Sequence, residues 1–107
     1  MDNQENIIFE GDIYFPIKHQ NFVNTDLVIS TSGKILNKKT KRLRKIQDNG
    51  DFCYGNRKKV NVGRLVGLTF MSGDIDVNGN DFKVLSKKKI KHLDGVNANN
   101  HINNLSW

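Results

Sequence analysis

The stretch VGRLVGLTF, residues 62–70, is where the periodicity of the chain changes from that of strands to that of a helix. Val62, Leu65, Val66, Thr69 and Phe70 recur at i, i+3, i+4, i+7 and i+8, which predicts a helix over residues 62–71. Gly63 and Gly67 lie one turn apart within it, and each lowers helix propensity by about 1 kcal/mol relative to alanine. Their presence indicates that another part of the chain closely approaches the helix backbone.

Before this helix, residues 27–61 predict a β-meander. Short β-rich runs are separated by turn signals, among them the glycines at 33, 50 and 55. These runs cover 27–29, 34–36, 41–46, 52–54 and 59–62. After the helix, Asn78-Gly79 lies between short alternating segments, which predicts a hairpin within residues 75–85. Residues 86–91 predict a basic strand or loop.

The first 26 residues form an acidic segment with two short apolar runs, 7–9 and 13–15. These runs predict either an edge strand or a segment that docks on the body of the protein. The fold class is therefore expected to be α+β, with one main helix. We expect an N-terminal segment over 1–26 and a single domain over 27–107, divided into a basic β-meander (27–61), the helix (62–71) and a hairpin with a terminal unit (75–107).

Composition excludes several classes of protein. The chain has 107 residues, of which 36% are hydrophobic, so we expect one domain with a small core. The single cysteine, Cys53, excludes an internal disulfide and a zinc site built from cysteines. No apolar run approaches the roughly 18 residues of a membrane span, and no secretory leader is recognised. We therefore expect a cytoplasmic protein, in the host cytoplasm if the chain is viral, that does not bind membranes.

The charge is distributed unevenly along the chain. Seventeen Lys and Arg residues outnumber 11 Asp and Glu residues, which gives a formal net charge of +6. Residues 1–33 hold one base against five acids, whereas residues 34–91 hold 16 bases against five acids. Such an excess suits a polyanion, most often nucleic acid. The residues that we expect to contact DNA are Lys38, Lys39, Lys41, Arg42, Arg44, Lys45, Arg57, Lys58, Lys59, Arg64, Lys87, Lys88, Lys89 and Lys91.

Two stretches carry a resemblance to a known family. They are the helix VGRLVGLTF and the terminal segment KHLDGVNANNHINNLSW, residues 91–107. In this order they resemble the HNH homing endonucleases of phages and introns, whose pattern is a helix of the type HRLVAxxF, then HxDGxxxNN, then xxNLxW. Residues 27–62 resemble the β-rich module, of the NUMOD4 type, that often precedes this motif. The resemblance spans residues 27–107 and implies a viral or mobile-element origin.

The resemblance implies a ββα-metal unit around one divalent ion, Mg²⁺ or Mn²⁺. By position, His92 matches the general base that activates water. Asn104 matches the asparagine that braces the loop so that the histidine points correctly. Asp94-Gly95 matches the turn, and Asp94 is the candidate metal ligand. In this family the metal neutralises the charge that develops on the scissile phosphate.

Three departures from the family pattern predict that cleavage is impaired or lost. Lys91 stands where the family has an Asp or Asn ligand, and its ammonium group would repel a divalent cation. The helix that carries the second ligand would follow Trp107, so the resemblance implies a truncated unit. Gly63 stands where the family's helix begins with His. The oxygen donors that remain as substitute ligands are Asp94, Asn97 and Asn100.

The leading hypothesis is therefore a double-stranded DNA-binding protein that acts as a regulator or an inhibitor. One alternative is an active Mg²⁺-dependent nickase that uses His92 as general base and is completed by a homodimer. Another is a protein-binding inhibitor of a nucleic-acid enzyme, which docks through residues 1–15. Loss of nicking in His92→Ala separates the nickase from the leading hypothesis. A steep salt dependence of DNA binding separates both from the protein-binding alternative.

Overall fold

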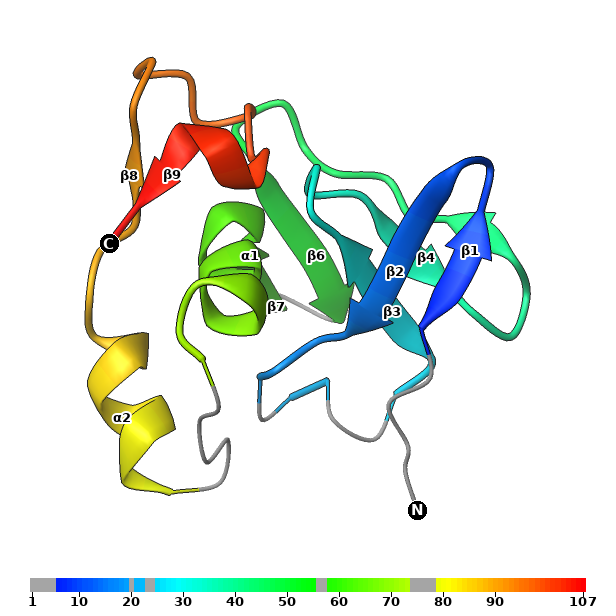
Figure 1. Ribbon diagram of the computed structural model, residues 1–107, viewed down its shortest axis with the longest axis horizontal. Coiled ribbons are helices and arrows are strands. Elements are labelled where there is room, and N and C mark those ends of the chain that lie inside the picture. Colours follow the sequence, from blue (N-terminus) through cyan, green and yellow to red (C-terminus); the bar gives the residue numbers. More distant parts are fainter. Residues whose placement is uncertain (1–5, 20, 23–24, 56–57, 74–78) are drawn as a thin grey trace.

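The structure, a computed structural model, describes residues 6–19, 21–22, 25–55, 58–73 and 79–107. Its largest element is an antiparallel sheet made of β1 (Ile7–Phe9), β2 (Asp12–Pro16), β3 (Leu27–Ser30), β4 (Ile35–Asn37) and β5 (Arg42–Leu43), in that order. Two smaller strand pairs, two α-helices and a short 3-10 helix complete the described fold, which confirms the predicted α+β class (Figure 1). Neither of these helices is long and apolar enough to cross a membrane.

The central strand β3 is buried on both faces. Ile29 packs with Ile35 of β4 in the main core against the helix, whereas Val28 packs with Leu36 and Tyr14 on the opposite face. The second cluster is sheltered because the sheet is curled, so its own strands enclose that face (Figure 1). A chain with few hydrophobic residues therefore builds two small cores, one on each side of the same strand.

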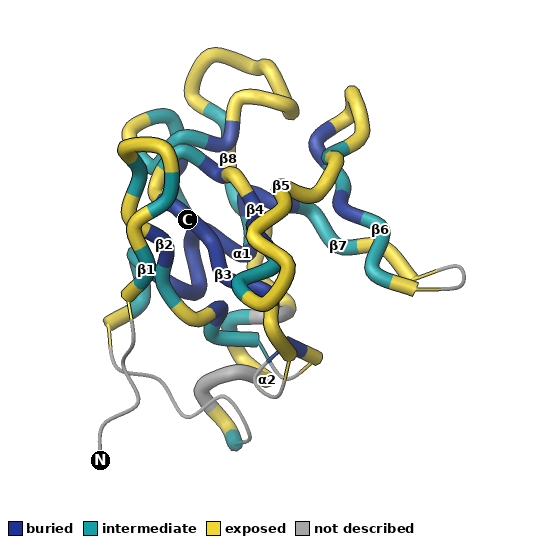
Figure 2. The backbone as a smooth tube through the Cα atoms, turned by 90° about the vertical axis from the view of Figure 1, so that its right-hand side faces the viewer, coloured by how far each residue is buried: buried dark blue, intermediate teal, exposed yellow. Residues whose placement is uncertain are grey.

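The main helix, α1 (Val62–Phe70), directly follows the hairpin formed by β6 (Asp51–Gly55) and β7 (Lys58–Asn61). Asn61 is its N-cap, since the side-chain oxygen accepts a hydrogen bond from the Arg64 backbone N–H at 3.3 Å. Seven of its nine residues are buried, so α1 lies at the centre of the molecule (Figure 2). The helix predicted over residues 62–71 is confirmed, with Met71 as its C-cap.

The hairpin predicted over residues 75–85 is wrong where the structure describes the chain. Residues 80–86 form the helix α2 (Asn80–Ser86), for which Gly79 is the N-cap. Residues 75–78 of the predicted hairpin lie outside the described residues. The Asn-Gly pair specifies only two turn positions and leaves the conformation of the following residues open. In α2, Lys83 lies in the last turn, where its positive charge interacts favourably with the helix dipole. The turn signal therefore precedes a helix and does not link two strands.

The strand predicted over residues 41–46 is shorter than expected. Only β5 pairs with β4, after which the Arg44 N–H donates to the Ile35 carbonyl at 2.7 Å. The chain then leaves the sheet and approaches β6, where the Gln47 N–H donates to the Asp51 carbonyl at 2.9 Å. The alternating pattern of this stretch thus belongs mostly to an exposed connection between two sheets.

Residues 7–16 of the acidic segment belong to the same sheet as the meander. β1 is an edge strand that pairs with β2, and β2 pairs with β3 in a register that places Tyr14 opposite Ser30. The Asp12 carboxylate also forms an ion pair with the Lys34 ammonium group at 3.2 Å. The run 7–9 is therefore an edge strand, which was one of the two alternatives, and the run 13–15 lies in β2, which pairs on both sides.

The terminal segment 91–107 packs over α1. β8 (Lys91–His92) pairs with β9 (Leu105–Ser106), and the short 3-10 helix η1 (Ile102–Asn104) precedes β9. The Ile102 N–H donates to the Thr31 carbonyl at 2.8 Å, which ties the segment to the β3–β4 turn. Residues that are distant in sequence are thereby brought together around the N-terminal end of α1.

Candidate functional site

The loop between β8 and η1 is braced by Asn104. Its side-chain oxygen accepts a hydrogen bond from the Asp94 backbone N–H at 3.1 Å. Its side-chain nitrogen donates to Asp94 Oδ1 and to the Asn99 carbonyl, both at 2.9 Å. One amide side chain thus connects both ends of the loop, which is the bracing geometry that the resemblance implies for this position.

Asp94, the candidate metal ligand, directs its carboxylate into the same network. Asp94 Oδ2 accepts from Asn99 Nδ2 at 2.8 Å, and Asp94 Oδ1 accepts from the Val96 N–H at 2.8 Å and from Asn104. Hydrogen bonds from Asn99, Val96 and Asn104, in that order of importance, lower the pKa of the Asp94 carboxyl. The carboxylate therefore stays ionised and its lone pairs serve the loop.

His92, the candidate general base, is half-buried and contacts a second asparagine. Its Nε2 lies 2.6 Å from Asn100 Oδ1. Because an amide oxygen only accepts hydrogen bonds, this contact requires the proton of the ring to be on Nε2. With the Asn100 amide in this orientation, Nε2 is therefore the donor of the contact.

Three glycines from separate parts of the chain surround the segment 97–100. An added Cβ at Gly33 would meet Asn100, and one at Gly50 would overlap the Asn97 carbonyl oxygen. At Gly63 it would lie 2.9 Å from Asn100 Oδ1 and 3.0 Å from His92 Nε2. A side chain at position 63, where the family has His, does not fit beside the His92–Asn100 contact.

The close approach predicted for the two helix glycines is confirmed. The backbone at Gly63 lies against the side chains of Asn100 and His92. An added Cβ at Gly67 would lie 2.8 Å from Trp107 Cζ2 and 3.1 Å from Ile90 Cδ1. Both glycines therefore allow the terminal segment to lie directly on the backbone of α1.

Metal-ligating side chains are sparse among the described residues of the terminal unit. The described residues contain no group of three His, Cys, Asp or Glu side chains arranged to hold an ion. Lys91 is exposed next to His92, and the Asp94 carboxylate is engaged within the loop. The terminal unit is held together by amide side chains.

The structure places most of the predicted DNA-contacting bases at the surface. Lys38 and Arg64 are half-buried, and Arg57 lies outside the described residues. The exposed ones are Lys39, Lys41, Arg42, Arg44, Lys45, Lys58, Lys59, Lys87, Lys88, Lys89 and Lys91. None of these forms an ion pair with a described residue, unlike Lys34, which pairs with Asp12.

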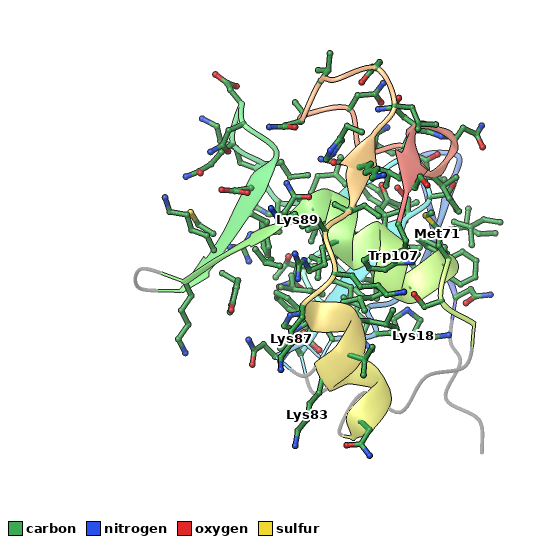
Figure 3. The ribbon with its side chains drawn as sticks, turned by 90° about the vertical axis from the view of Figure 1, so that its left-hand side faces the viewer. Lys18, Met71, Lys83, Lys87, Lys89 and Trp107 are labelled. Atoms are coloured by element: carbon green, nitrogen blue, oxygen red, sulfur yellow. The ribbon has the colours of Figure 1, made fainter. Side chains whose placement is uncertain are left out.

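These bases gather on two sides of the molecule. The Arg44 guanidinium lies 5.4 Å from the centre of the Phe52 ring, and Gln47 Nε2 donates to Cys53 Sγ at 3.1 Å. These contacts bring residues 44–47 beside β6, whereas Arg42 remains in β5, which pairs with β4. The run 87–91 lies across the molecule from residues 39–45 (Figure 1). Figure 3 shows Lys83, Lys87 and Lys89 along α2 and the segment after it.

Sequence reasoning named Asn100 only as a substitute ligand and missed its structural position. Asn100 is 4% exposed, and contacts with residues 33, 50 and 63 converge on it. The sequence features that could have indicated this position are the adjacent asparagines at 99–100 and the glycines at 33, 50 and 63, but no local sequence pattern connects them.

Comparison of the chain with models of protein families, with curated proteins and with solved structures yields no match.

Proposed function

We propose that this chain binds double-stranded DNA, with residues 39–45 and the β6–β7 hairpin as the principal contact surface. The observation that carries this proposal is a run of exposed bases without ion-pair partners among the described residues: Lys39, Lys41, Arg42, Arg44 and Lys45. Such bases release counterions from the phosphate backbone when they bind, which favours association at low salt. Lys58 and Lys59 extend the same surface along β7.

We further propose that the protein binds DNA without cutting it. The observation that supports this part of the proposal is that the carboxylate of Asp94, the candidate metal ligand, accepts hydrogen bonds from its own loop. The resemblance of the terminal segment to HNH endonucleases is consistent with an ancestor that cut DNA. A protein that retains only binding would act as a regulator or an inhibitor by occupying its site.

Fluorescence anisotropy with a labelled duplex, measured over a range of salt concentrations, tests the proposal. Two triple variants remove the same charge from opposite sides of the molecule: Lys39→Gln/Lys41→Gln/Arg42→Gln and Lys87→Gln/Lys88→Gln/Lys89→Gln. If each base of the first set contacts one phosphate, that variant lowers the salt slope by about 2.7, because each contact contributes about 0.9. We expect a smaller decrease for the second variant. Equal binding by both variants and the parent would contradict the assigned surface.

Supercoiled plasmid separates binding from cleavage. We expect retardation in Mg²⁺, in Mn²⁺ and in EDTA, with no nicked product. Nicking that depends on either metal and disappears in His92→Ala would support the nickase alternative, including one completed by a homodimer. Absence of retardation at low salt would reject the DNA proposal and favour a protein partner that docks through residues 1–15.

A further inference from the structure

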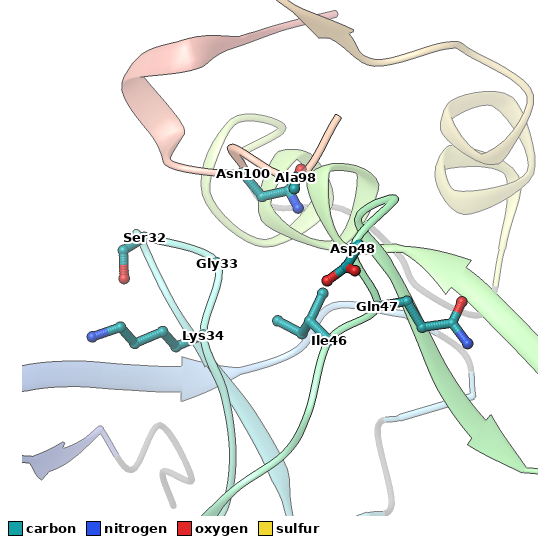
Figure 4. A pocket seen from close by; sticks show the side chains of 8 residues that line it. All are labelled: Ser32, Gly33, Lys34, Ile46, Gln47, Asp48, Ala98 and Asn100. Carbon is teal, nitrogen blue, oxygen red and sulfur yellow. The ribbon is translucent and has the colours of Figure 1, made fainter. Parts of the chain in front are cut away.

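A cavity of about 340 Å³ lies where the terminal loop meets two other segments (Figure 4). Its walls come from the β3–β4 turn, from the connection that precedes β6 and from the loop after β8. The polar side chains among them are Ser32, Lys34, Gln47, Asp48 and Asn100. Its volume is within the range of about 300–1,000 Å³ that is typical of small-molecule sites.

The most unusual group in this cavity is the side-chain nitrogen of Asn100. The residue is 4% exposed, and its Oδ1 is used by His92 Nε2. No described residue accepts a hydrogen bond from Asn100 Nδ2. In Figure 4 this nitrogen points towards the side of the cavity where Ile46 and Asp48 lie. Among the described residues, the side-chain atom that is both buried and unpaired is Trp107 Nε1, so Asn100 Nδ2 reaches the open space of the cavity, where it can donate to an acceptor of a ligand.

The other groups that line the cavity would contact the rest of such a ligand. Asp48 supplies a carboxylate with two acceptor oxygens, and the half-buried Ile46 supplies an apolar surface. Lys34 supplies an ammonium group at the rim, where its exposed ion pair with Asp12 is a weak competitor for a phosphate. A fitting ligand therefore has a flat apolar face, one acceptor beside two donors, and a nearby negative charge.

We propose that this cavity binds a guanine base and its phosphate. The Watson–Crick edge of guanine has the O6 acceptor beside the N1–H and N2–H donors. O6 would accept from Asn100 Nδ2, the two donors would face the Asp48 carboxylate, and the ring would lie against Ile46. Guanine is favoured because it alone among the four common bases presents two adjacent ring-edge donors to a carboxylate. Adenine and cytosine present one amino group there, and uracil presents one N–H between two acceptors.

Two sources share this chemistry, a free guanine nucleotide and an unpaired guanine in a strand. Paired guanine is not a candidate because its Watson–Crick edge is occupied. The proposal goes beyond duplex binding and does not depend on it. Its site is formed by residues 32–34, 46–48 and 98–100, whereas the proposed duplex surface is formed by residues 39–45 and the β6–β7 hairpin.

Titration of the full chain with GMP, followed by NMR, tests the proposal directly. We expect saturable shifts of the Asn100 side-chain amide, with AMP, CMP and UMP binding roughly tenfold more weakly or worse, because each leaves a polar group of the site unpaired. Asp48→Asn should lose GMP binding and gain binding of xanthosine monophosphate, whose C2 oxygen accepts from the new amide. Asp26→Asn removes an equal charge from an exposed position outside the cavity and should keep the GMP preference.

The outcomes are distinct. Binding of GMP, or of a thymine-rich single strand with one guanine, that is lost in Asp48→Asn supports the proposal and identifies the source. Equal shifts with all four nucleotides would mean that only phosphate contacts the lysines, and would overturn it. Unchanged GMP binding in Asp48→Asn, or no GMP binding at millimolar concentration together with none of the single strand, would also overturn it. Duplex anisotropy is unaffected by these outcomes, so failure of one proposal leaves the other intact.

Discussion

The core between the sheet and α1 and the terminal segment 91–107 are held by different kinds of contact. In the core, Ile29, Ile35 and Leu65 are fully buried and pack side chain against side chain. In the loop of the terminal segment, residues 93–99 are all exposed, and hydrogen bonds of Asp94 and Asn104 keep its shape. The core is stabilised by buried apolar surface. The terminal segment is stabilised by hydrogen bonds, and it packs closely against glycines of other segments.

This difference teaches how a chain of modest hydrophobicity fixes a polar loop. Packing in the core is the sum of many weak contacts, so no single pair of atoms determines it. Docking of the loop depends on single atoms, such as Asn100 Oδ1 against Gly63. Substitutions in the core should therefore destabilise the whole protein, whereas those at the loop should first release the terminal segment.

The largest effect is expected for Ile29→Ala. Ile29 is 0% exposed in the main core, and truncation of such a side chain typically costs about 3–4 kcal/mol. Ile13 lies on the same face of the sheet but is 48% exposed, so Ile13→Ala is a matched control that should cost less than about 0.5 kcal/mol. Urea unfolding followed by circular dichroism measures both. A similar loss for the two variants would mean that the core does not lie where the structure places it.

Next in size is Gly50→Ala, which tests the docking of the loop. Gly50 has φ = +88° and would place a Cβ against the Asn97 carbonyl oxygen. We expect a loss of about 2–3 kcal/mol, from left-handed strain together with overpacking. Gly11 has φ = +87°, and an added Cβ there would meet nothing within 4 Å. Gly11→Ala therefore introduces left-handed backbone strain without overpacking, at a cost of about 1 kcal/mol.

The fluorescence of Trp107, the single tryptophan, reports on this docking because its ring lies on Gly67. In Gly50→Ala we expect the tryptophan signal to change at lower urea concentration than the circular dichroism signal. Equal stability of Gly50→Ala and Gly11→Ala would show that the glycine is not needed for close approach of the loop.

The same contrast explains what could be predicted from sequence. The helix at 62–70 and the strands at 27–30 and 35–37 follow from local periodicity, and they were predicted nearly to the residue. The close approach at Gly63 and Gly67 was predicted because glycine lowers helix propensity, so its presence within a helix indicates contact with another segment. The helix α2 was missed because a turn signal of two residues does not determine the conformation of the residues after it.

The curl of the sheet and the position of Asn100 could not be predicted. Both depend on contacts between residues far apart in the chain, such as Gly33 with Asn100. No periodicity in the sequence records that pairing. The bracing role of Asn104 came from the resemblance, whereas the engagement of the Asp94 carboxylate by its own loop became visible only with the hydrogen bonds of the structure.

A smaller effect is expected for Asn104→Ala, which removes three hydrogen bonds within an exposed loop. Solvent replaces part of what is lost, so we expect a cost of about 1–2 kcal/mol. Hydrogen exchange of the Leu93 and Val96 amides should become faster, since both amides donate within the braced loop. Asn103→Ala is the control, because its exposed side chain bonds to no described residue. Equal acceleration in both variants would refute the bracing role.

The smallest effect concerns pH and involves His19, in the turn before β3. His19 Nδ1 accepts a hydrogen bond from the Asn21 N–H at 3.1 Å, and its ring packs against Phe22. Burial, and secondarily the charge of Arg64, lower the pKa of His19 below its ordinary value of 6.5. As the pH falls through about 6.5, the unfolded chain therefore binds a proton that the folded chain does not. Stability should decrease from that pH downward until the lower folded pKa is passed.

The variant His19→Gln isolates this contribution, since its side-chain oxygen can accept the same hydrogen bond without titrating. We expect the free energy of unfolding to fall less between pH 7.5 and pH 5 in His19→Gln than in the parent, measured by urea unfolding at constant ionic strength. His92 and His101 remain in both proteins, so they contribute equally to the two profiles. Parallel profiles would mean that the turn takes up the proton without cost, and that the contact with Asn21 does not hold the ring in its neutral form.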